Sequence, residues 1–324
     1  MKVIIAEKCG FCPGVRNAIS MAEKALSKPP QSKDPAHNNV YSLGPIIHNK
    51  DMVQHLAKAG LKTVNTIDEI KSGTVIIRSH GACPETIAKL KEKGLNILDA
   101  TCILVKRLQQ IAEQLAKEGY QVIIIGDENH PEVKSVVGCV TRHTSGGQAH
   151  QVSNERKVIV VAQAVDLHKI PENGKLGVVC QTTCSPEHFA SILAGIAKLK
   201  FRELKVINTL CKEAIARQES AVRLCKQVDI MFVLGDRESA NTRTLAQLCK
   251  KYNPQTFHLQ NWSEFDKNII RALPIGKTGK NMVGVTAGAS TPEWVITEFV
   301  ENLSMLATYR ANNNRQETGG KNSG

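Results

Sequence analysis

Three cysteines stand at corners where an apolar, strand-like run ends and a helical pattern begins: Cys12, Cys102 and Cys211. Apolar residues recur at helical spacing after Cys12 and Cys102, and less regularly after Cys211. One thiol at each of three similar corners predicts three units that converge on one centre. Thiolates are soft ligands that select iron–sulfur clusters or zinc, so we expect the chemistry of the protein to take place at that centre.

Cys9 and Cys12 also form a Cys-x-x-Cys motif, which is typical of zinc sites and thioredoxin-like proteins. No second close Cys/His pair follows at the spacing of a zinc finger, and only one short strand precedes the motif. A four-iron cluster on three thiolates would keep one iron open for a substrate oxygen while supplying electrons. The sequence has no nicotinamide or flavin fingerprint, which favours an external one-electron donor.

Polar residues suited to ligand binding follow nearly every strand-like run. They include His48, His80, His130, Glu132, Thr182, Thr183, Ser239, Asn241 and Ser290. Ligands bind at the carboxyl ends of parallel strands, and imidazoles, hydroxyls and amides together suit phosphate oxygens. Singly, each has an ordinary explanation, such as a helix cap or a first-turn carboxylate. Their concentration at strand ends instead predicts one binding site. No P-loop or clean dinucleotide fingerprint supports an ordinary nucleotide site.

The elements that must position these residues alternate between strands and helices. Apolar, β-branched runs occur at 40–43, 74–77, 121–125, 157–161, 176–179, 229–234 and 282–285. Such runs read as buried parallel strands, and the helical stretches between them predict an α/β fold. We expect three α/β units: residues 1–102, which include the N-terminal strand and Cys12, then 103–205, then 206–306 with a C-terminal helix. The polar composition of residues 307–324 predicts a disordered tail.

The composition limits the possible partners. A net charge of +12 favours the approach of an anionic substrate or an acidic electron carrier. Without a tight Lys/Arg block or interleaved aromatic residues, we expect no nucleic-acid partner. No apolar run approaches the roughly 18 residues of a membrane span, and no signal peptide is evident. We therefore expect a cytoplasmic protein whose ten cysteines serve metal binding, catalysis or burial rather than disulfides.

Several motifs, in order along the chain, resemble the 4-hydroxy-3-methylbut-2-enyl diphosphate reductase family, also called IspH/LytB. They are Gly10-Phe11-Cys12-Pro13-Gly14-Val15, Ser79-His80-Gly81, Asp99-Ala100-Thr101-Cys102, His130-Pro131-Glu132, Gln181-Thr182-Thr183, Arg217-Gln218 and the segment 284–290. The resemblance covers roughly residues 1–305. It implies two-electron, two-proton removal of an allylic hydroxyl, the last step of the non-mevalonate isoprenoid pathway, to give isopentenyl and dimethylallyl diphosphate.

The resemblance also implies a trefoil of three α/β units with parallel sheets around a central [4Fe-4S] cluster. Cys12, Cys102 and Cys211 would hold the cluster, whose fourth iron would bind the substrate hydroxyl. Glu132 would donate a proton, with the hydroxyl of Thr182 or Thr183 near the leaving oxygen. The diphosphate would be bound by His48, His80, His130, Ser239, Ala240, Asn241 and Ser290. Ferredoxin or flavodoxin would supply the electrons.

Two positions depart from the family pattern. Glu213 and Ala214 stand where members usually carry Ala-Thr after the third cysteine, and Ala240 replaces the middle serine of Ser-Ser-Asn. A lost hydrogen bond to a charged group costs about 1.5–3 kcal/mol, so we expect weaker diphosphate binding, although the Ala240 backbone N–H can still contribute. The alternatives are a divergent reductase of another substrate and a non-catalytic iron–sulfur redox protein. Retention of Glu132 and the three histidines disfavours the second.

Overall fold

The computed structural model describes the chain of 324 residues except residues 30–31, 142–157, 267, 270–281 and 320–324 and the side chains of residues 307–319. The chain forms two compact units. Residues 13–215 form the first, here called the middle unit, and residues 1–12 with 216–324 form the terminal unit.

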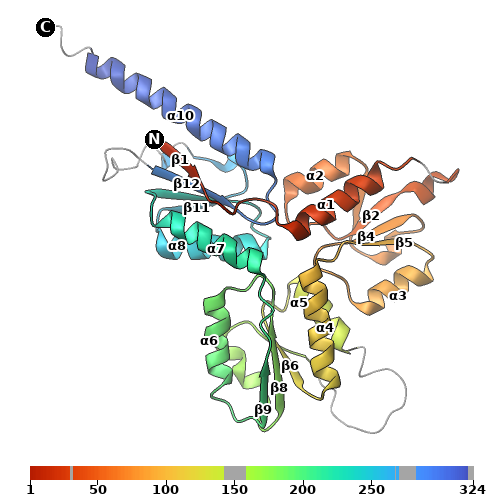
Figure 1. The fold of residues 1–324 in the computed structure, drawn as a ribbon. Coiled ribbons are helices and arrows are strands. Elements are labelled where there is room, and N and C mark those ends of the chain that lie inside the picture. Colours follow the sequence, from red (N-terminus) through yellow and green to blue (C-terminus); the bar gives the residue numbers. More distant parts are fainter. Residues whose placement is uncertain (30–31, 142–157, 267, 270–281, 320–324) are drawn as a thin grey trace. The chain divides into compact units, whose positions relative to one another are not determined.

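The middle unit contains two four-stranded parallel sheets (Figure 1). In spatial order, the first consists of β3 (Leu61–Val64), β2 (Val40–Leu43), β4 (Thr74–Ile77) and β5 (Asn96–Asp99). The second consists of β7 (Ile159–Val161), β6 (Gln121–Ile125), β8 (Lys175–Cys180) and β9 (Glu203–Val206). Their helices are α1 (Pro13–Leu26), α2 (Lys50–Lys58), α3 (Pro84–Glu92), α4 (Ile103–Lys117), α5 (Pro131–Thr141) and α6 (Pro186–Ile196).

The terminal unit contains a third parallel sheet, in the order β1 (Lys2–Ile5), β12 (Met282–Ala287), β10 (Ile230–Leu234) and β11 (Thr256–Leu259). Its helices are α8 (Ala240–Tyr252) and α10 (Glu293–Gly319), together with most of α7 (Lys212–Cys225). Short 3-10 turns occur at Pro35–Asn38, Ile67–Glu69, Ala164–Lys169 and Trp262–Glu264. Three parallel four-stranded sheets with intervening helices confirm the predicted α/β class.

The three sheets repeat one topology. In each, the second strand lies at one edge, followed by the first, the third and a fourth strand at the other edge. In the terminal unit that fourth strand is β1, from the opposite end of the chain. The expectation that the N-terminal strand belongs to a unit of residues 1–102 was therefore wrong, because β5 already occupies the fourth position of that sheet and the edge of β12 is filled by β1.

This repeat explains the three cysteine corners. Cys12 follows β1, Cys102 follows β5 and Cys211 follows β9, and each of these strands is the fourth of its sheet. Each cysteine therefore follows the last strand of its sheet. It does not mark the start of a new unit along the chain. The order of the strands also reverses between the first and third strands of each sheet. Such switch points are where open parallel sheets bind ligands.

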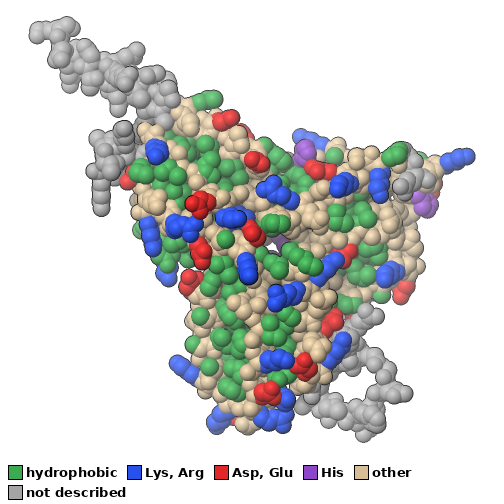
Figure 2. All heavy atoms as spheres, in the orientation of Figure 1, with side chains coloured by type: hydrophobic (Ala, Val, Ile, Leu, Met, Phe, Trp, Pro, Cys, Tyr) green, Lys and Arg blue, Asp and Glu red, His purple; other side chains and the backbone are tan. Residues whose placement is uncertain are grey.

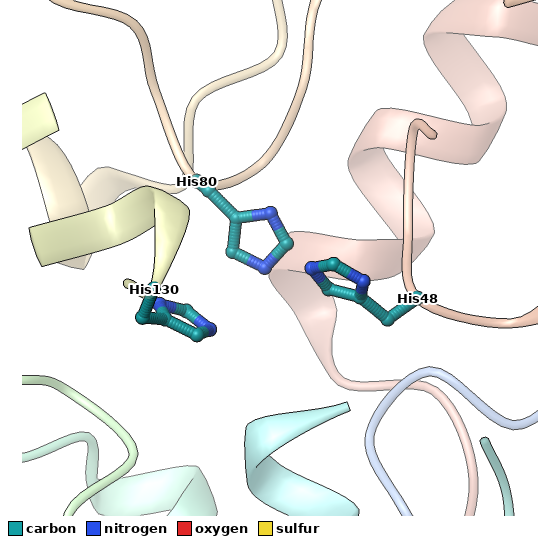
Figure 3. A group of neighbouring side chains, drawn as sticks. All are labelled: His48, His80 and His130. Atoms are coloured by element: carbon teal, nitrogen blue, oxygen red, sulfur yellow. The ribbon is translucent and has the colours of Figure 1, made fainter. Parts of the chain in front are cut away.

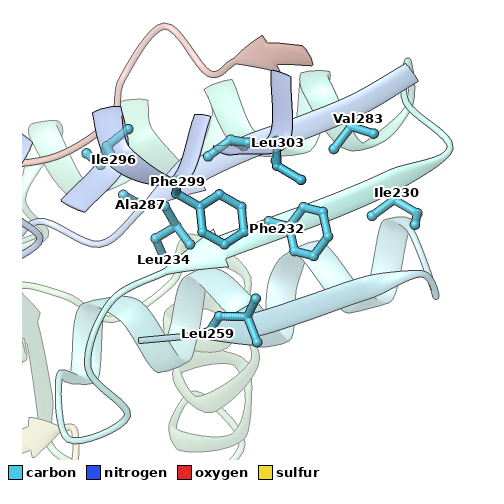
Figure 4. Packing of buried hydrophobic residues seen from close by; sticks show 10 residues of the cluster. Ile230, Phe232, Leu234, Leu259, Val283, Ala287, Ile296, Phe299 and Leu303 are labelled. Atoms are coloured by element: carbon cyan, nitrogen blue, oxygen red, sulfur yellow. The ribbon is translucent and has the colours of Figure 1, made fainter. Parts of the chain in front are cut away.

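Buried apolar residues cover both faces of the sheets, as expected of parallel strands. In β6, Val122 and Ile124 pack with α4 and α5, whereas Ile123 and Ile125 pack on the opposite side with α6. In the terminal unit, Phe232 of β10 meets Phe299 of α10 edge to face, with ring centroids 5.2 Å apart (Figure 4). Helix α10 continues to Gly319, where the sequence predicted a disordered tail from residue 307, because extending an anchored helix costs far less than nucleating one.

Charged side chains are interspersed on the visible face in Figure 2, where Lys and Arg lie among acidic and apolar residues. Among the described residues, no helix combines the length and apolar character needed to cross a membrane.

Candidate functional site

Three histidines gather at the switch points of the middle unit. His48 follows β2, His80 follows β4 and His130 follows β6, immediately before α5. The ring centroid of His80 lies 5.0 Å from that of His48 and 5.2 Å from that of His130 (Figure 3). One nitrogen from each ring can be chosen so that all three lie within 4.8 Å of one another. Residues 82 positions apart in the sequence thus form one cluster, as the strand-end pattern predicted.

Turns and caps fix the histidine loops. Asn49 caps α2 by accepting the Met52 N–H at 2.9 Å, which fixes the backbone next to His48. Gly81 has a φ of +77° and closes a tight turn by donating its N–H to the Arg78 carbonyl at 3.0 Å. A side chain would be strained at this φ. A Cβ atom at residue 81 would also lie 2.8 Å from the Gln109 side-chain nitrogen.

The charge state of His80 follows from its burial. Burial lowers the pKa of His80 well below its usual value, and the charges of His130, His48 and Arg78 lower it further. The Nδ1 atom of His130 accepts the Glu132 backbone N–H at 3.2 Å, so the neutral ring carries its proton on Nε2. Neutral imidazoles can bind a metal ion or donate to an anion. An anionic ligand would reverse the pKa shift by stabilising the imidazolium form.

Glu132, two residues after His130, carries a buried carboxyl group. The residue is 2% exposed, and its two oxygens accept the backbone N–H of Thr182 at 2.7 Å and the Thr182 hydroxyl at 2.8 Å. Burial raises the pKa of Glu132, and the two bonds from Thr182 partly oppose this. A carboxyl group that retains its proton in a buried site is suited to act as a general acid.

Thr182 and Thr183 have different hydrogen-bond partners. Thr183 lies next to Thr182, but its hydroxyl accepts the side-chain N–H of Gln181 at 3.2 Å. The side-chain oxygen of Gln181 accepts the backbone N–H of Asp127 at 3.0 Å. This bond connects the loop after β8 to the loop that carries His130. The sequence suggested Thr182 or Thr183 without a choice, and the geometry associates Thr182 with Glu132.

Ser135 and Gln109, which the sequence analysis did not single out, contact the backbone around His80 and Glu132. The Ser135 hydroxyl lies 3.0 Å from the His80 carbonyl oxygen and 2.7 Å from that of Glu132. Gln109 donates to the same hydroxyl at 3.2 Å. The spacing of Glu132 and Ser135 by three residues on α5 is the one sequence signal for this contact.

The three corner cysteines each directly precede a helix. Cys102 is the N-cap of α4, and Cys12 and Cys211 stand before the first residues of α1 and α7. Their backbone N–H groups donate to the carbonyl oxygens of Ala289, Ser79 and Thr182, at 3.2 Å for Cys12, 3.0 Å for Cys102 and 2.9 Å for Cys211. None of the three is in a disulfide within the described part of the chain. Helix N-termini stabilise thiolates, so this donor set fits an iron–sulfur cluster.

Cys9 differs from these cysteines. Burial raises the pKa of its thiol to about 11, and the side chain packs against the apolar cluster around Phe232. A thiol that keeps its proton at neutral pH is a poor metal ligand. The Cys-x-x-Cys spacing is thus no sign of a paired site, which agrees with the comparison of the three corners. Cys102 and Cys211 belong to the middle unit and Cys12 to the terminal unit.

The remaining predicted residues lie in the terminal unit, at the switch point between β10 and β12. Ser239 caps α8, and its hydroxyl accepts a hydrogen bond from Ser290 at 3.3 Å. Asn241 is 7% exposed, and its side-chain nitrogen has no hydrogen-bond partner within the described part of the chain. A buried donor without an acceptor beside a helix N-terminus fits an anionic ligand. Ala240, the first residue of α8, adds no hydroxyl.

The family model of the LytB protein matches residues 3–304. A 4-hydroxy-3-methylbut-2-enyl diphosphate reductase from Pelobacter propionicus is 39% identical over 306 residues, covering 94% of this chain and 99% of the relative. The reductase of the same name from Aquifex aeolicus is 40% identical over 305 residues, covering 94% and 96%.

Two solved reductase structures are also similar to this chain. A reductase structure described as the terminal enzyme of the non-mevalonate pathway has a TM-score of 0.65 and 38% identity, covering 94% of this chain and 100% of the other. The corresponding reductase from Plasmodium falciparum has a TM-score of 0.78 and 27% identity, covering 94% and 88%. The matched family model, the relatives and the ordered motifs confirm the resemblance: the chain belongs to the LytB family of 4-hydroxy-3-methylbut-2-enyl diphosphate reductases.

Proposed function

We propose that this chain reduces 4-hydroxy-3-methylbut-2-enyl diphosphate to isopentenyl and dimethylallyl diphosphate in the cytoplasm, as the last step of the non-mevalonate pathway. The names of its relatives support the reaction. The observation in the chain itself that carries the proposal is the buried Glu132 carboxyl group, which is held by Thr182 and follows His130 of the histidine cluster by two residues.

The reaction breaks the allylic C–O bond and consumes two electrons and two protons. One proton converts the departing hydroxyl to water, and the other goes to the allylic carbon chain. Glu132 supplies the first proton, because burial raises its pKa and the carboxyl group therefore keeps its proton to a higher pH than an exposed glutamate does. The Thr182 hydroxyl orients this carboxyl group through its bond to one of the carboxyl oxygens.

The residues to which we assign diphosphate binding, as the family resemblance implies, are His48, His80, His130, Ser239, Asn241 and Ser290. Donation from neutral imidazoles, hydroxyls and an amide suits its oxygens. A charged imidazole favoured by the bound diphosphate would add a charge-assisted bond. Ala240 contributes only its backbone N–H at the start of α8.

Cys12, Cys102 and Cys211 are the residues that would hold a [4Fe-4S] cluster, since each places a thiol directly before a helix. When bound, such a cluster would provide the electron-transfer chemistry, with an external one-electron donor such as ferredoxin or flavodoxin. The histidine cluster can also be read as a metal site. We favour the diphosphate there, because the sequence already provides three thiols for iron.

Anaerobic reconstitution tests this assignment. Serine variants of Cys12, Cys102 or Cys211 should each lose most of the four-iron absorption and bound iron, whereas C9S should retain both. The E132Q variant should keep the full cluster and lose turnover by about 10²–10⁴-fold. Unchanged turnover in E132Q would refute the role of Glu132. A full cluster in wild-type protein without any turnover would favour the divergent reductase or the redox protein.

A further inference from the structure

A cavity in the middle unit is lined by none of the substrate-binding imidazoles and hydroxyls named above, although its lining residues include neighbours of His80 and His130 in the sequence. Its volume is about 260 Å³, and it opens between the N-terminal parts of α3 and α5. Its polar lining comes from Arg78, Cys83, Thr86, Asn129, Lys134 and Ser135. No aspartate or glutamate is among its lining residues, so the charged groups at the cavity are both cations.

Arg78 is the central feature of this cavity. It follows β4, and its guanidinium group lies against Gly44, where a Cβ atom would be 2.8 Å from Nη1. Within the described residues, the guanidinium group makes no hydrogen bond or ion pair. Burial lowers the pKa of Arg78, which shows the cost of removing this cation from water. Such a group is stabilised by an anion that accepts its hydrogen bonds.

Further donors face the same space. Lys134 is exposed on α5 and forms no ion pair among the residues that the structure describes. The Thr86 hydroxyl lies 3.0 Å from the Cys83 sulfur, so both line the cavity together. Residues at the starts of α3 and α5, which begin at Pro84 and Pro131, also line the cavity, and helix N-termini favour negative charge.

A neighbouring cavity in the same unit provides a contrast. It has a volume of about 530 Å³ and contains two lysines, Lys91 and Lys106, but also Asp99 and Glu113. Lys106 is paired with Asp99 at 2.6 Å. The charges of that larger cavity are therefore balanced by the protein itself. Among the described residues, Arg78 and Lys134 have no such acidic partner in their cavity.

We propose that the Arg78 cavity is a second anion site, which binds a phosphate or diphosphate group separately from the substrate. The small volume suits a compact oxyanion rather than a larger organic molecule, and a guanidinium group can bind two phosphate oxygens at once. Arg78 is also one of the charges that keep His80 neutral. An anion bound at Arg78 would therefore stabilise the charged form of His80. In this way, occupation of the Arg78 cavity would affect binding at the substrate site.

Isothermal titration of the full-length protein with inorganic phosphate, and separately with inorganic diphosphate, tests the site without any turnover. Chloride holds the ionic strength constant. We expect saturable binding that weakens about tenfold or more in R78Q, by loss of hydrogen bonds to a charged group. In K134Q it weakens about threefold, as for an exposed ion pair. The matched control K89Q removes an exposed α3 lysine outside the cavity and should bind as wild type.

Binding that is unchanged in both R78Q and K134Q would overturn the proposal, as would no saturable binding to the wild-type protein. Binding that is lost in S290A but retained in R78Q would assign the anion to the substrate residues and overturn it equally. K134Q keeps the test valid if R78Q fails to fold, because Lys134 is exposed. Tighter binding of diphosphate than phosphate, or the reverse, identifies which anion the cavity takes, and either order supports the site.

Discussion

The Thr182 hydroxyl is predicted to set the pH range in which Glu132 can donate its proton. In the T182V variant the backbone N–H bond to Glu132 at 2.7 Å remains, but the hydroxyl bond at 2.8 Å is lost. Valine has nearly the shape of threonine, so the buried packing is retained. The lost bond stabilises the charged carboxylate, because Thr182 lowers the pKa that burial raises.

A hydrogen bond to a charged group contributes about 1.5–3 kcal/mol. Its loss shifts the equilibrium between the carboxylic acid and the carboxylate by roughly ten- to a hundredfold toward the acid. Since the proton donor must be protonated, activity is present below the pKa of Glu132 and is lost as the pH rises through it. The alkaline limb of the kcat profile of T182V should therefore move to higher pH, even if kcat itself falls.

Steady-state rates of the reconstituted protein, measured anaerobically across pH with reduced viologen as donor, give this limb. T183V is the matched control, because the Thr183 hydroxyl bonds Gln181 instead of Glu132, and its limb should stay in place. An alkaline limb that is unmoved in T182V, or that moves equally in T183V, would refute the assignment of Glu132 as the titrating proton donor.

Three further predictions concern other residues. A240S should restore a hydroxyl at the start of α8 and lower the KM for the diphosphate substrate by about tenfold in steady-state kinetics. A KM that is unchanged or higher would show that Ala240 does not face the diphosphate. Because the folded state of wild type binds the Glu132 proton more tightly than the unfolded state, this stabilisation is present at low pH and lost as the pH rises. The melting temperature of cluster-free E132Q relative to wild type should therefore increase with pH, and a constant difference would contradict the raised pKa. G288A should lower the free energy of unfolding by about 1–3 kcal/mol in urea denaturation, since a Cβ atom would lie 1.9 Å from the Thr242 hydroxyl oxygen. In the control G174A a Cβ atom would make only an ordinary contact with Leu176 at 3.7 Å, and an equal loss there would contradict this cause.

The positions of the site residues along the chain could be predicted because parallel strands direct their following loops to one edge of a sheet. His48, His80 and His130 were selected in this way, and their rings do lie together. The choice between Thr182 and Thr183 could not be made, because adjacent residues in a loop point in directions that depend on its turn.

The place of the N-terminal strand depended on pairing between the ends of the chain. Val3 of β1 lies opposite Val283 of β12, and no local pattern encodes a contact over this separation. The repeated strand order became visible only with that pairing. Similarly, Cys9 could be separated from Cys12 by its burial, a property that Cys-x-x-Cys spacing alone does not give.

The most direct test of the proposed function is the product analysis of one reaction. The anaerobically reconstituted wild-type protein, with a full four-iron cluster and reduced viologen, is mixed with 4-hydroxy-3-methylbut-2-enyl diphosphate, and the products are separated by chromatography. We predict isopentenyl and dimethylallyl diphosphate, together accounting for one product per two electrons consumed. Unchanged substrate in the presence of a fully occupied, reducible cluster would contradict the proposed reaction.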